Sequence, residues 1–443
     1  MVMAFGIGML GFAQVVWSTG ETLGNLFWVV AGVAAGVGVF MHVVVRARTP
    51  YAEPIILPTA YLLNLLGLVM IFRLDIADTQ RAAANDSPAP TPTVTSQITW
   101  MILGALLVAA TLLLVRDHRR LQKITYISLL GGVILLLLPL VPGLGLTING
   151  ATLWIKVGPY TFQPGEIAKI LLAIFLAGFL VTSRDTLSLV RRRFLGIAIP
   201  RGRDLGPILI AWVIALGVLV FEKDLGTAIV FFGMFVSVLF IATGRRSWVI
   251  IAGVLVVIGG IFAYFAFGHV RVRFQIWLDP FAYQNDQGYQ IVQSLFGLAN
   301  GGILGTGLGQ GYPQLVPFAN SDFIIASFGE ELGLTGLTAM LLMFAILIQR
   351  GLRTAIACRD TFGRLLAAAL SSVFALQVFV VVGGVTKLIP MTGLTTPFLS
   401  AGGSALIANW IMVGLLLRIS HDTRRPERVL PSTVEDSRSV GAP

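Results

Sequence analysis

Long hydrophobic segments, separated by short polar or charged stretches, follow one another along almost the whole chain. Most are about 17 to 25 residues long, the length at which a helix crosses roughly 30 Å of hydrocarbon. When the chain is cut at turn residues and charge clusters, the pattern predicts about twelve transmembrane helices. They are expected near residues 2–17, 25–45, 54–73, 98–115, 124–143, 164–181, 206–221, 225–242, 247–267, 322–348, 363–385 and 391–417.

The composition agrees with an all-α polytopic membrane protein. Of the 443 residues, 56% are hydrophobic and only 12% are charged, which is far from the balance of an ordinary soluble domain. The first segment has no basic stretch before it and no small-residue cleavage site after it. We therefore expect this segment to stay in the protein rather than to be removed as a signal peptide.

The basic residues predict how the chain is oriented. Lys and Arg in short loops stay on the cytoplasmic side of a membrane, and here they gather in every second loop, so both termini are predicted to be cytoplasmic. The same distribution accounts for the net charge of +10 without nucleic acid as a partner. The basic loops are Arg46–Arg48, Arg116–Lys123, Arg191–Arg193, Arg201–Arg203, Arg245–Arg246, Arg350–Arg364 and the C-terminal tail.

The residues that could hold a metal are few. Cys358 is the one cysteine, so an intramolecular disulfide is impossible, and the four histidines have no zinc-binding spacing. No residue is assigned to a metal, and a divalent cation remains open as a cofactor.

Polar and turn-forming residues gather in the loops predicted to face outward. Four regions differ from ordinary loops: residues 145–165, the charged turn at residues 222–224, the long loop 268–321, and residues 386–410, which interrupt the last hydrophobic segment with Pro, Gly and hydroxyl residues. Non-helical backbone at membrane depth is tolerated only where it is buried in protein or lines a cavity. Several such regions on one side predict an outward-facing polar cavity.

Glu166 and Lys169 lie at the start of an otherwise apolar helix. Residues three positions apart share a helix face, so the two charges are expected to meet. The pair either locks two helices together or has a chemical task, as ionisable residues inside membrane spans commonly do. Glu222 and Asp224 are alternatively helix N-caps.

The glycine-rich run NGGILGTGLGQG, residues 300–311, carries no following GKT or GKS, so we interpret it as tight turns and close packing rather than a phosphate loop. Of Glu330 and Glu331, where the long loop returns to the membrane, one is expected to face water.

Six motifs in order resemble the SEDS family (shape, elongation, division and sporulation), which includes RodA, FtsW and SpoVE. They are NGATLWIKVG, QPGEIAK, EKDLGTA, GYQIVQSLFGLANGGILGTGLGQG, SDFIIASFGEELGLTG and TGLTTPFLSAGGSALI. The resemblance implies a ten-helix core at residues 54–420, with its long extracytoplasmic loop at 268–321. Residues 1–53 then hold two additional helices, and residues 421–443 form a cytoplasmic tail that we expect to be disordered.

The resemblance implies a peptidoglycan glycosyltransferase that polymerises lipid II at the outer face of the cytoplasmic membrane, for cell elongation or division. It also implies a class B penicillin-binding protein, a transpeptidase, as partner. The two extra N-terminal segments and QPGEIAKILLAIF favour the RodA branch. An outward cavity has no access to nucleotide sugars, so a donor activated and delivered within the membrane fits it independently.

Two other classes of function share some of these sequence features. A flippase for the lipid-linked sugar would also use broken helices and a buried ion pair, but it needs polar groups in both halves of the membrane, and the inward loops look merely basic. A scaffold that only docks other enzymes would need no buried charges.

The family's essential aspartate, five positions before the Gly of GYQ, falls on Tyr283 here, so the loop must be shifted locally. Asp286 and Asp279 are the candidates for the general base that removes the proton of the acceptor hydroxyl. We favour Asp286, because Asp279 before Pro280 resembles a turn-forming residue.

The resemblance places further residues in substrate binding. The family's Arg before Trp is Leu153 here and its Tyr before GGS is Ala401, so the usual diphosphate contacts are altered, and Lys156, Lys387, Arg271 or Arg273 could replace them. The candidate substrate-binding residues are Glu166, Lys169, Trp154, Lys156, Glu222, Asp224, Ser400, Gly402, Gly403, Ser404 and Lys387.

Overall fold

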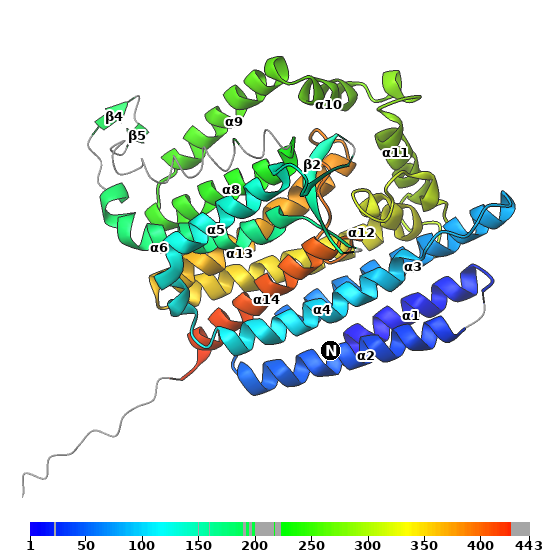
Figure 1. Cartoon of the computed structure of the whole chain (residues 1–443), viewed down its shortest axis with the longest axis horizontal. Coiled ribbons are helices and arrows are strands. Elements are labelled where there is room, and N and C mark those ends of the chain that lie inside the picture. Colours follow the sequence, from blue (N-terminus) through cyan, green and yellow to red (C-terminus); the bar gives the residue numbers. More distant parts are fainter. Residues whose placement is uncertain are drawn as a thin grey trace, which may run out of the picture.

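Helices make up most of the protein (Figure 1). The computed structural model describes residues 1–426 apart from 22–23, 149, 159, 189–191, 195–196, 200–216 and 218–222. Its α-helices are α1 Val2–Ser18, α2 Asn25–Arg48, α3 Ile56–Ala84, α4 Thr93–Leu114, α5 Thr125–Leu137, α6 Pro164–Ser188, α8 Leu225–Thr243, α9 Ser247–Ala266, α10 Gly268–Leu278, α11 Tyr289–Gly301, α12 Ile324–Ala357, α13 Thr361–Val385 and α14 Gly403–Arg424.

Shorter elements lie between the helices. The 3-10 turns are η1 His118–Ile124, η2 Leu138–Leu140, η3 Phe281–Tyr283 and η4 Pro313–Leu315. The strands are β1 Gly145–Ile148, β2 Ala151–Val157, β3 Tyr160–Phe162, β4 Arg192–Phe194 and β5 Ile197–Ile199. Strands β1, β2 and β3 form an antiparallel sheet in that order, and β4 pairs with β5.

Ten helical segments of the described chain are long and apolar enough to cross a membrane, and α1 is a shorter apolar helix. The prediction of an all-α polytopic membrane protein is therefore confirmed. The predicted segment at 206–221 lies outside the described residues, as does the tail from residue 427. The last predicted segment, 391–417, becomes helical only at Gly403, because its first part is the Pro- and Gly-containing loop.

The spans differ in how deeply they are buried. In α14, 89% of the residues in the most apolar window are buried, whereas in α9 only 6% are. Small residues allow the central helices to approach closely: a Cβ on Gly67 of α3 would collide with the Leu399 carbonyl, and one on Gly104 of α4 would collide with the Trp410 ring. Such close approach is typical of helix packing in membranes.

The two N-terminal helices pack on this core. Gly8 and Gly11 of α1 lie against Leu65 and Val69 of α3. The Tyr61 hydroxyl donates a hydrogen bond to the Ala34 carbonyl of α2 across 2.6 Å. Helices α1 and α2 are therefore seated on α3 rather than separate from it.

The bundle has two different ends. At the first, called here the loop-rich end, lie the β1–β3 sheet, α10, α11 and the non-helical segment 386–402 (Figure 1). At the second, the basic end, lie the C-terminal parts of α12 and α14 together with η1. Hydrogen bonds join the parts of each end to one another.

The basic end carries a buried polar network, so the expectation that it is merely basic is wrong. His118 is buried, with Nδ1 2.7 Å from Asp422 and Nε2 2.8 Å from Asp360. The Glu53 carboxylate is buried against Arg424 and lies 3.5 Å from Arg350. These contacts tie η1, α12, α13 and α14 together.

The glycine-rich run wraps around Glu330 and Glu331. Glu331 pairs with Arg73 at 2.9 Å and accepts a hydrogen bond from the Gly309 backbone, and Glu330 accepts one from the Tyr312 backbone. Both glutamates are buried, so the expectation that one faces water is wrong. The glycines let the backbone N–H groups come close enough to replace water.

Candidate functional site

A buried ion pair stands at the start of α6, where the spacing of Glu166 and Lys169 predicts it. Lys169 Nζ lies 2.7 Å from Glu166 Oε2, and both side chains are 3% exposed. Lys169 also donates to Gln377 Oε1 of α13 across 3.1 Å, and the Gln377 amide donates to the Thr395 carbonyl across 2.9 Å. The lysine charge is thus connected through Gln377 to the non-helical segment 386–402.

Asp224 lies just outside the membrane span of α8. Its Oδ1 accepts the Thr227 backbone N–H at 2.9 Å, so it is the N-cap that the alternative interpretation expected. Burial raises the pKa of Asp224, the hydrogen bonds from Thr227 lower it, Glu166 raises it and Arg273 lowers it. The cap is therefore also an electrostatic neighbour of Glu166 and of Arg273.

Arg273 of α10 joins this group to the last loop. Its Nη1 donates to the carbonyls of Met391 and Thr392, across 3.2 and 2.9 Å. Burial lowers the pKa of Arg273, and the charges of Asp224 and Asp322 raise it. The guanidinium is thus held at the loop-rich end among acids from two other parts of the chain.

Asp322 is an acid of this group that the sequence analysis missed. Burial raises its pKa to about 6, Arg273 opposes the shift, and Asp224 adds to it. Its Oδ2 lies 3.6 Å from the position of a Cβ on Gly393, next to the Thr392 carbonyl that holds Arg273. The sequence did contain a signal for this residue, because Asp322 is a carboxylate just before the apolar start of α12.

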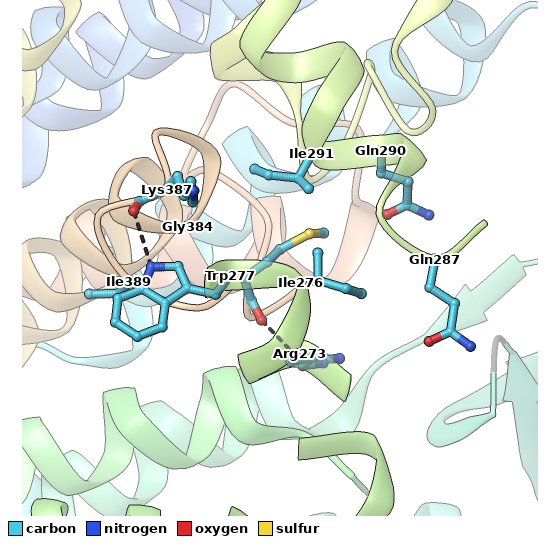
Figure 2. A pocket seen from close by; sticks show the side chains of 10 residues that line it. Arg273, Ile276, Trp277, Gln287, Gln290, Ile291, Gly384, Lys387 and Ile389 are labelled. Carbon is cyan, nitrogen blue, oxygen red and sulfur yellow. Dashed lines mark hydrogen bonds between the residues drawn. The ribbon is translucent and has the colours of Figure 1, made fainter. Parts of the chain in front are cut away.

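A cavity of about 160 Å³ opens beside these charges (Figure 2). Helices α10 and α11 and the segment after α13 contribute its walls. Gln287 and Gln290 lie on the side opposite Lys387, with Ile276 and Ile291 between them (Figure 2). The lining residues are Arg273, Ile276, Trp277, Gln287, Gln290, Ile291, Gly384, Lys387, Ile389 and Met391.

The two candidate bases lie in the turn between α10 and α11, and both are exposed. Asp279 Oδ1 accepts the Ala282 backbone N–H across 3.3 Å, the turn-forming contact expected of it. The Asp286 carboxylate accepts no hydrogen bond from any residue that the structure describes. Its sequence neighbour Gln287 lines the cavity, whereas Asp286 itself is not among the lining residues.

The serines of the last loop are engaged in the fold. Ser400 Oγ donates to the Ser321 carbonyl across 2.6 Å and accepts the Thr396 N–H across 2.8 Å, and Ser404 Oγ accepts the Gln163 N–H across 2.8 Å. Gln97 bridges the segment by bonding both the Ser400 carbonyl and the Gly402 N–H. Whether these residues also bind substrate stays a prediction.

The other predicted residues do not line the cavity or lie outside the residues that the structure describes. Trp154 and Lys156 are on β2, where Lys156 is exposed, and neither lines the cavity. A Cβ on Gly403 would collide with the Trp100 ring, so this glycine serves close packing. Glu222 lies outside the described residues.

Within the described residues, the groups of His, Cys, Asp and Glu close enough to share a metal ion lie at the basic end. They are His118 with Cys358 and Asp360, and Asp117 with His118 and Asp422. At the loop-rich end of the described chain no such group assembles, so the acids there do not converge on one point.

The fold and the site define a class: a polytopic membrane protein in which buried charges lie beside a cavity at the loop-rich end of the bundle. A sequence profile of the FtsW, RodA and SpoVE family, described as "cell cycle protein", matches residues 54–425. The chain belongs to this family, as the six motifs predicted.

Curated relatives and solved structures agree. The chain is 51% identical over 391 residues to "Peptidoglycan glycosyltransferase RodA" of Mycobacterium tuberculosis, covering 88% of this chain and 82% of that protein. It is 46% identical over 433 residues to the protein of the same name from Mycobacterium leprae, covering 96% and 91%. "Probable peptidoglycan glycosyltransferase FtsW" of Geobacter metallireducens is 36% identical, covering 72% and 83%.

Two solved structures share the fold at 25% sequence identity. One is described as "Structural coordination of polymerization and crosslinking by a peptidoglycan synthase complex", with a TM-score of 0.68 over 85% of this chain and 99% of that chain. The other is the rod shape determining protein RodA of Thermus thermophilus, with a TM-score of 0.58 over 85% and 98%.

Proposed function

We propose that this protein is a peptidoglycan glycosyltransferase of the RodA branch, which polymerises lipid II at the outer face of the cytoplasmic membrane. The proposal rests on one observation: the buried Glu166–Lys169 pair is connected by hydrogen bonds to the loop that holds Arg273, and Arg273 lines a cavity at the loop-rich end. Relatives at 46 to 51% identity bear the name of this enzyme and branch, whereas the FtsW relative is 36% identical.

The proposed reaction needs a base and a charged setting for the leaving group. The acceptor sugar hydroxyl loses its proton to Asp286 as its oxygen forms a bond to the anomeric carbon of the donor. The bond from that carbon to the diphosphate oxygen breaks, and the electron pair leaves with the lipid diphosphate. General bases of this kind contribute typically 10²- to 10⁴-fold. Asp286 is favoured over Asp279 because Asp279 already accepts the Ala282 N–H.

The Glu166–Lys169 pair is proposed to set the electrostatic field beneath the cavity. Burying either charge alone would be costly, and the contact of 2.7 Å between them offsets this cost. Gln377 connects the pair by hydrogen bonds to the loop that holds Arg273. Asp224, near both groups, belongs to the same field. We assign these residues to orientation and charge balance rather than to proton transfer.

The loop-rich end is proposed to face outward, with both termini in the cytoplasm. The basic loops support this orientation. The chain offers a clean test because Cys358 is its one cysteine. In a Cys358→Ser background, Asp286→Cys should react with a membrane-impermeant maleimide added to intact cells, and Arg119→Cys should react only after permeabilisation. The reverse pattern would refute the orientation.

A class B penicillin-binding protein is proposed as the partner, since one structural relative is part of a complex that both polymerises and crosslinks. Its transmembrane helix would pack on the lipid-exposed surface of the bundle.

The enzyme assay uses purified protein, with and without a co-expressed transpeptidase, given lipid II and analysed for glycan polymer. Polymer from the wild type and its loss in Asp286→Asn are expected. If wild-type protein moves lipid II across vesicles but makes no polymer with the transpeptidase present, the flippase alternative replaces this proposal.

A further inference from the structure

Four cationic residues were candidates for holding a diphosphate, and the structure separates them. Arg271 is exposed and turns back to α9, where it bonds the Tyr264 and Phe265 carbonyls and lies 5.7 Å from the centre of the Tyr264 ring. Lys156 is exposed on β2. Arg273 and Lys387 remain, and both line the cavity of about 160 Å³.

Backbone contacts hold these two cations in place. The Met391 and Thr392 carbonyls bind Nη1 of Arg273, and no described residue accepts a hydrogen bond from its Nε or Nη2. Lys387 Nζ bonds the Leu278 carbonyl across 3.3 Å, while its own carbonyl accepts the Trp277 indole N–H across 3.1 Å (Figure 2). The end of α10 and the loop after α13 are therefore fastened together around the cavity.

Lys387 also has an unusual backbone. Its φ of 60° lies in the left-handed region, which is uncommon and strained for a residue with a side chain. Strained residues of this kind persist where surrounding contacts fix them, and they cluster at binding sites. The Trp277 bond supplies such a contact and keeps Lys387 at the cavity wall.

The cavity suits a small anionic group attached to a lipid. Its volume is about 160 Å³. Lys387 lies on one side and the amides of Gln287 and Gln290 on the other, with Ile276 and Ile291 between them and Arg273 below Ile276 in the view (Figure 2). Amides can bond sugar hydroxyls, and the apolar residues can contact the first carbons of a prenyl chain.

From this placement we infer that the cavity is the donor diphosphate subsite, in which Arg273 and Lys387 bind the leaving diphosphate of a prenyl-diphosphate sugar. The inference rests on the proposed function and fixes the arrangement of the two substrates. As the bond from the anomeric carbon to oxygen breaks, the growing negative charge is received by these two cations. The acceptor hydroxyl then approaches the anomeric carbon from the side of Asp286, next to Gln287.

The test measures binding separately from polymerisation. Full-length protein in nanodiscs is titrated with undecaprenyl diphosphate, and with uncharged undecaprenol as the control ligand. Arg273→Gln and Lys387→Gln should each weaken undecaprenyl diphosphate binding about tenfold, the usual cost of losing one hydrogen bond to a charged group. The control variant Arg81→Gln, at an exposed arginine in the last turn of α3, should bind as the wild type does, and undecaprenol binding should be the same in all four proteins.

Two further measurements keep the test decisive. Arg273→Lys, which keeps the charge, should recover part of the affinity, and thermal unfolding identifies any variant that is simply misfolded. Wild-type affinity in folded Arg273→Gln and Lys387→Gln overturns the subsite even if lipid II is polymerised. The two variants could instead lose affinity while the wild-type protein makes no polymer. That result would support the subsite and refute the proposed function.

Discussion

Both ends of the bundle bury charge, but they balance it differently. At the basic end His118 lies between two carboxylates, and Glu53 contacts two arginines. At the loop-rich end Arg273 stands near two acids without forming an ion pair with either, and it opens onto a cavity. Glu53 and Arg424 also line a cavity, of about 450 Å³, but there the two charges are paired with each other. Arg273 faces its cavity without an ion pair, so its charge is available to a ligand. The chemistry is therefore expected at the loop-rich end, around Arg273.

The largest effect is expected at Asp286. Asp286→Asn removes the proposed base and should lower lipid II polymerisation at least about 100-fold without changing thermal stability, since no described residue bonds this carboxylate. Polymer is measured by gel analysis of the product. The matched variant Asp279→Asn should cost less, and full activity of Asp286→Asn would move the base to Asp279.

The Glu166–Lys169 pair should affect both folding and activity. Lys169→Met leaves Glu166 buried without its partner, which should cost about 3–5 kcal/mol of stability. Combining it with Glu166→Gln should restore much of that stability, because no lone buried charge remains, but should not restore polymerisation. Recovery of polymerisation in the double variant would show that the pair only holds helices together and has no role in the reaction.

His118 provides the contrasting case at the basic end. Burial alone would raise the pKa of Asp360, but hydrogen bonds from His118 and the Gly363 backbone lower it. The stability that this lowered pKa contributes is present above the unfolded pKa, near 4, and is lost as the pH falls. His118→Ala should cost about 2 kcal/mol at neutral pH and leave polymerisation per folded molecule unchanged within about twofold. A loss as large as that of Asp286→Asn would erase the distinction between the ends.

The smallest effect is expected at Asp322. Its pKa of about 6 lies above the unfolded value near 4, so between these pH values the folded state binds more protons. Stability should therefore fall as the pH rises through this window. In thermal unfolding of detergent-solubilised protein, Asp322→Asn should flatten this dependence by on the order of 1 kcal/mol, after allowance for partial exposure. An unchanged slope would assign the dependence to Asp224 or to other acids.

How much the sequence could predict depended on distance along the chain. Glu166 and Lys169 are neighbours on one helix, so their spacing alone predicted the pair. Arg273 and Asp322 come together only because α10 and the start of α12 pack around the loop at residues 391–393. The local sequence pattern around either residue does not indicate that the folded chain brings Arg273 and Asp322 together.

The errors in the sequence analysis have the same origin. One of Glu330 and Glu331 was predicted to face water, but the chain some twenty residues earlier folds back, and the backbone N–H groups of Gly309 and Tyr312 satisfy both glutamates. Likewise, the basic loops predict a topology, but they do not indicate that His118, Asp360 and Asp422, far apart in sequence, form one network.

One comparison tests the central claim most directly: the rate of lipid II polymerisation by Asp286→Asn and by His118→Ala, each purified with its transpeptidase and normalised to folded protein. At least about a 100-fold loss is expected for the first variant and near wild-type activity for the second. Equal losses, or a larger loss for His118→Ala, would contradict the assignment of chemistry to the loop-rich end.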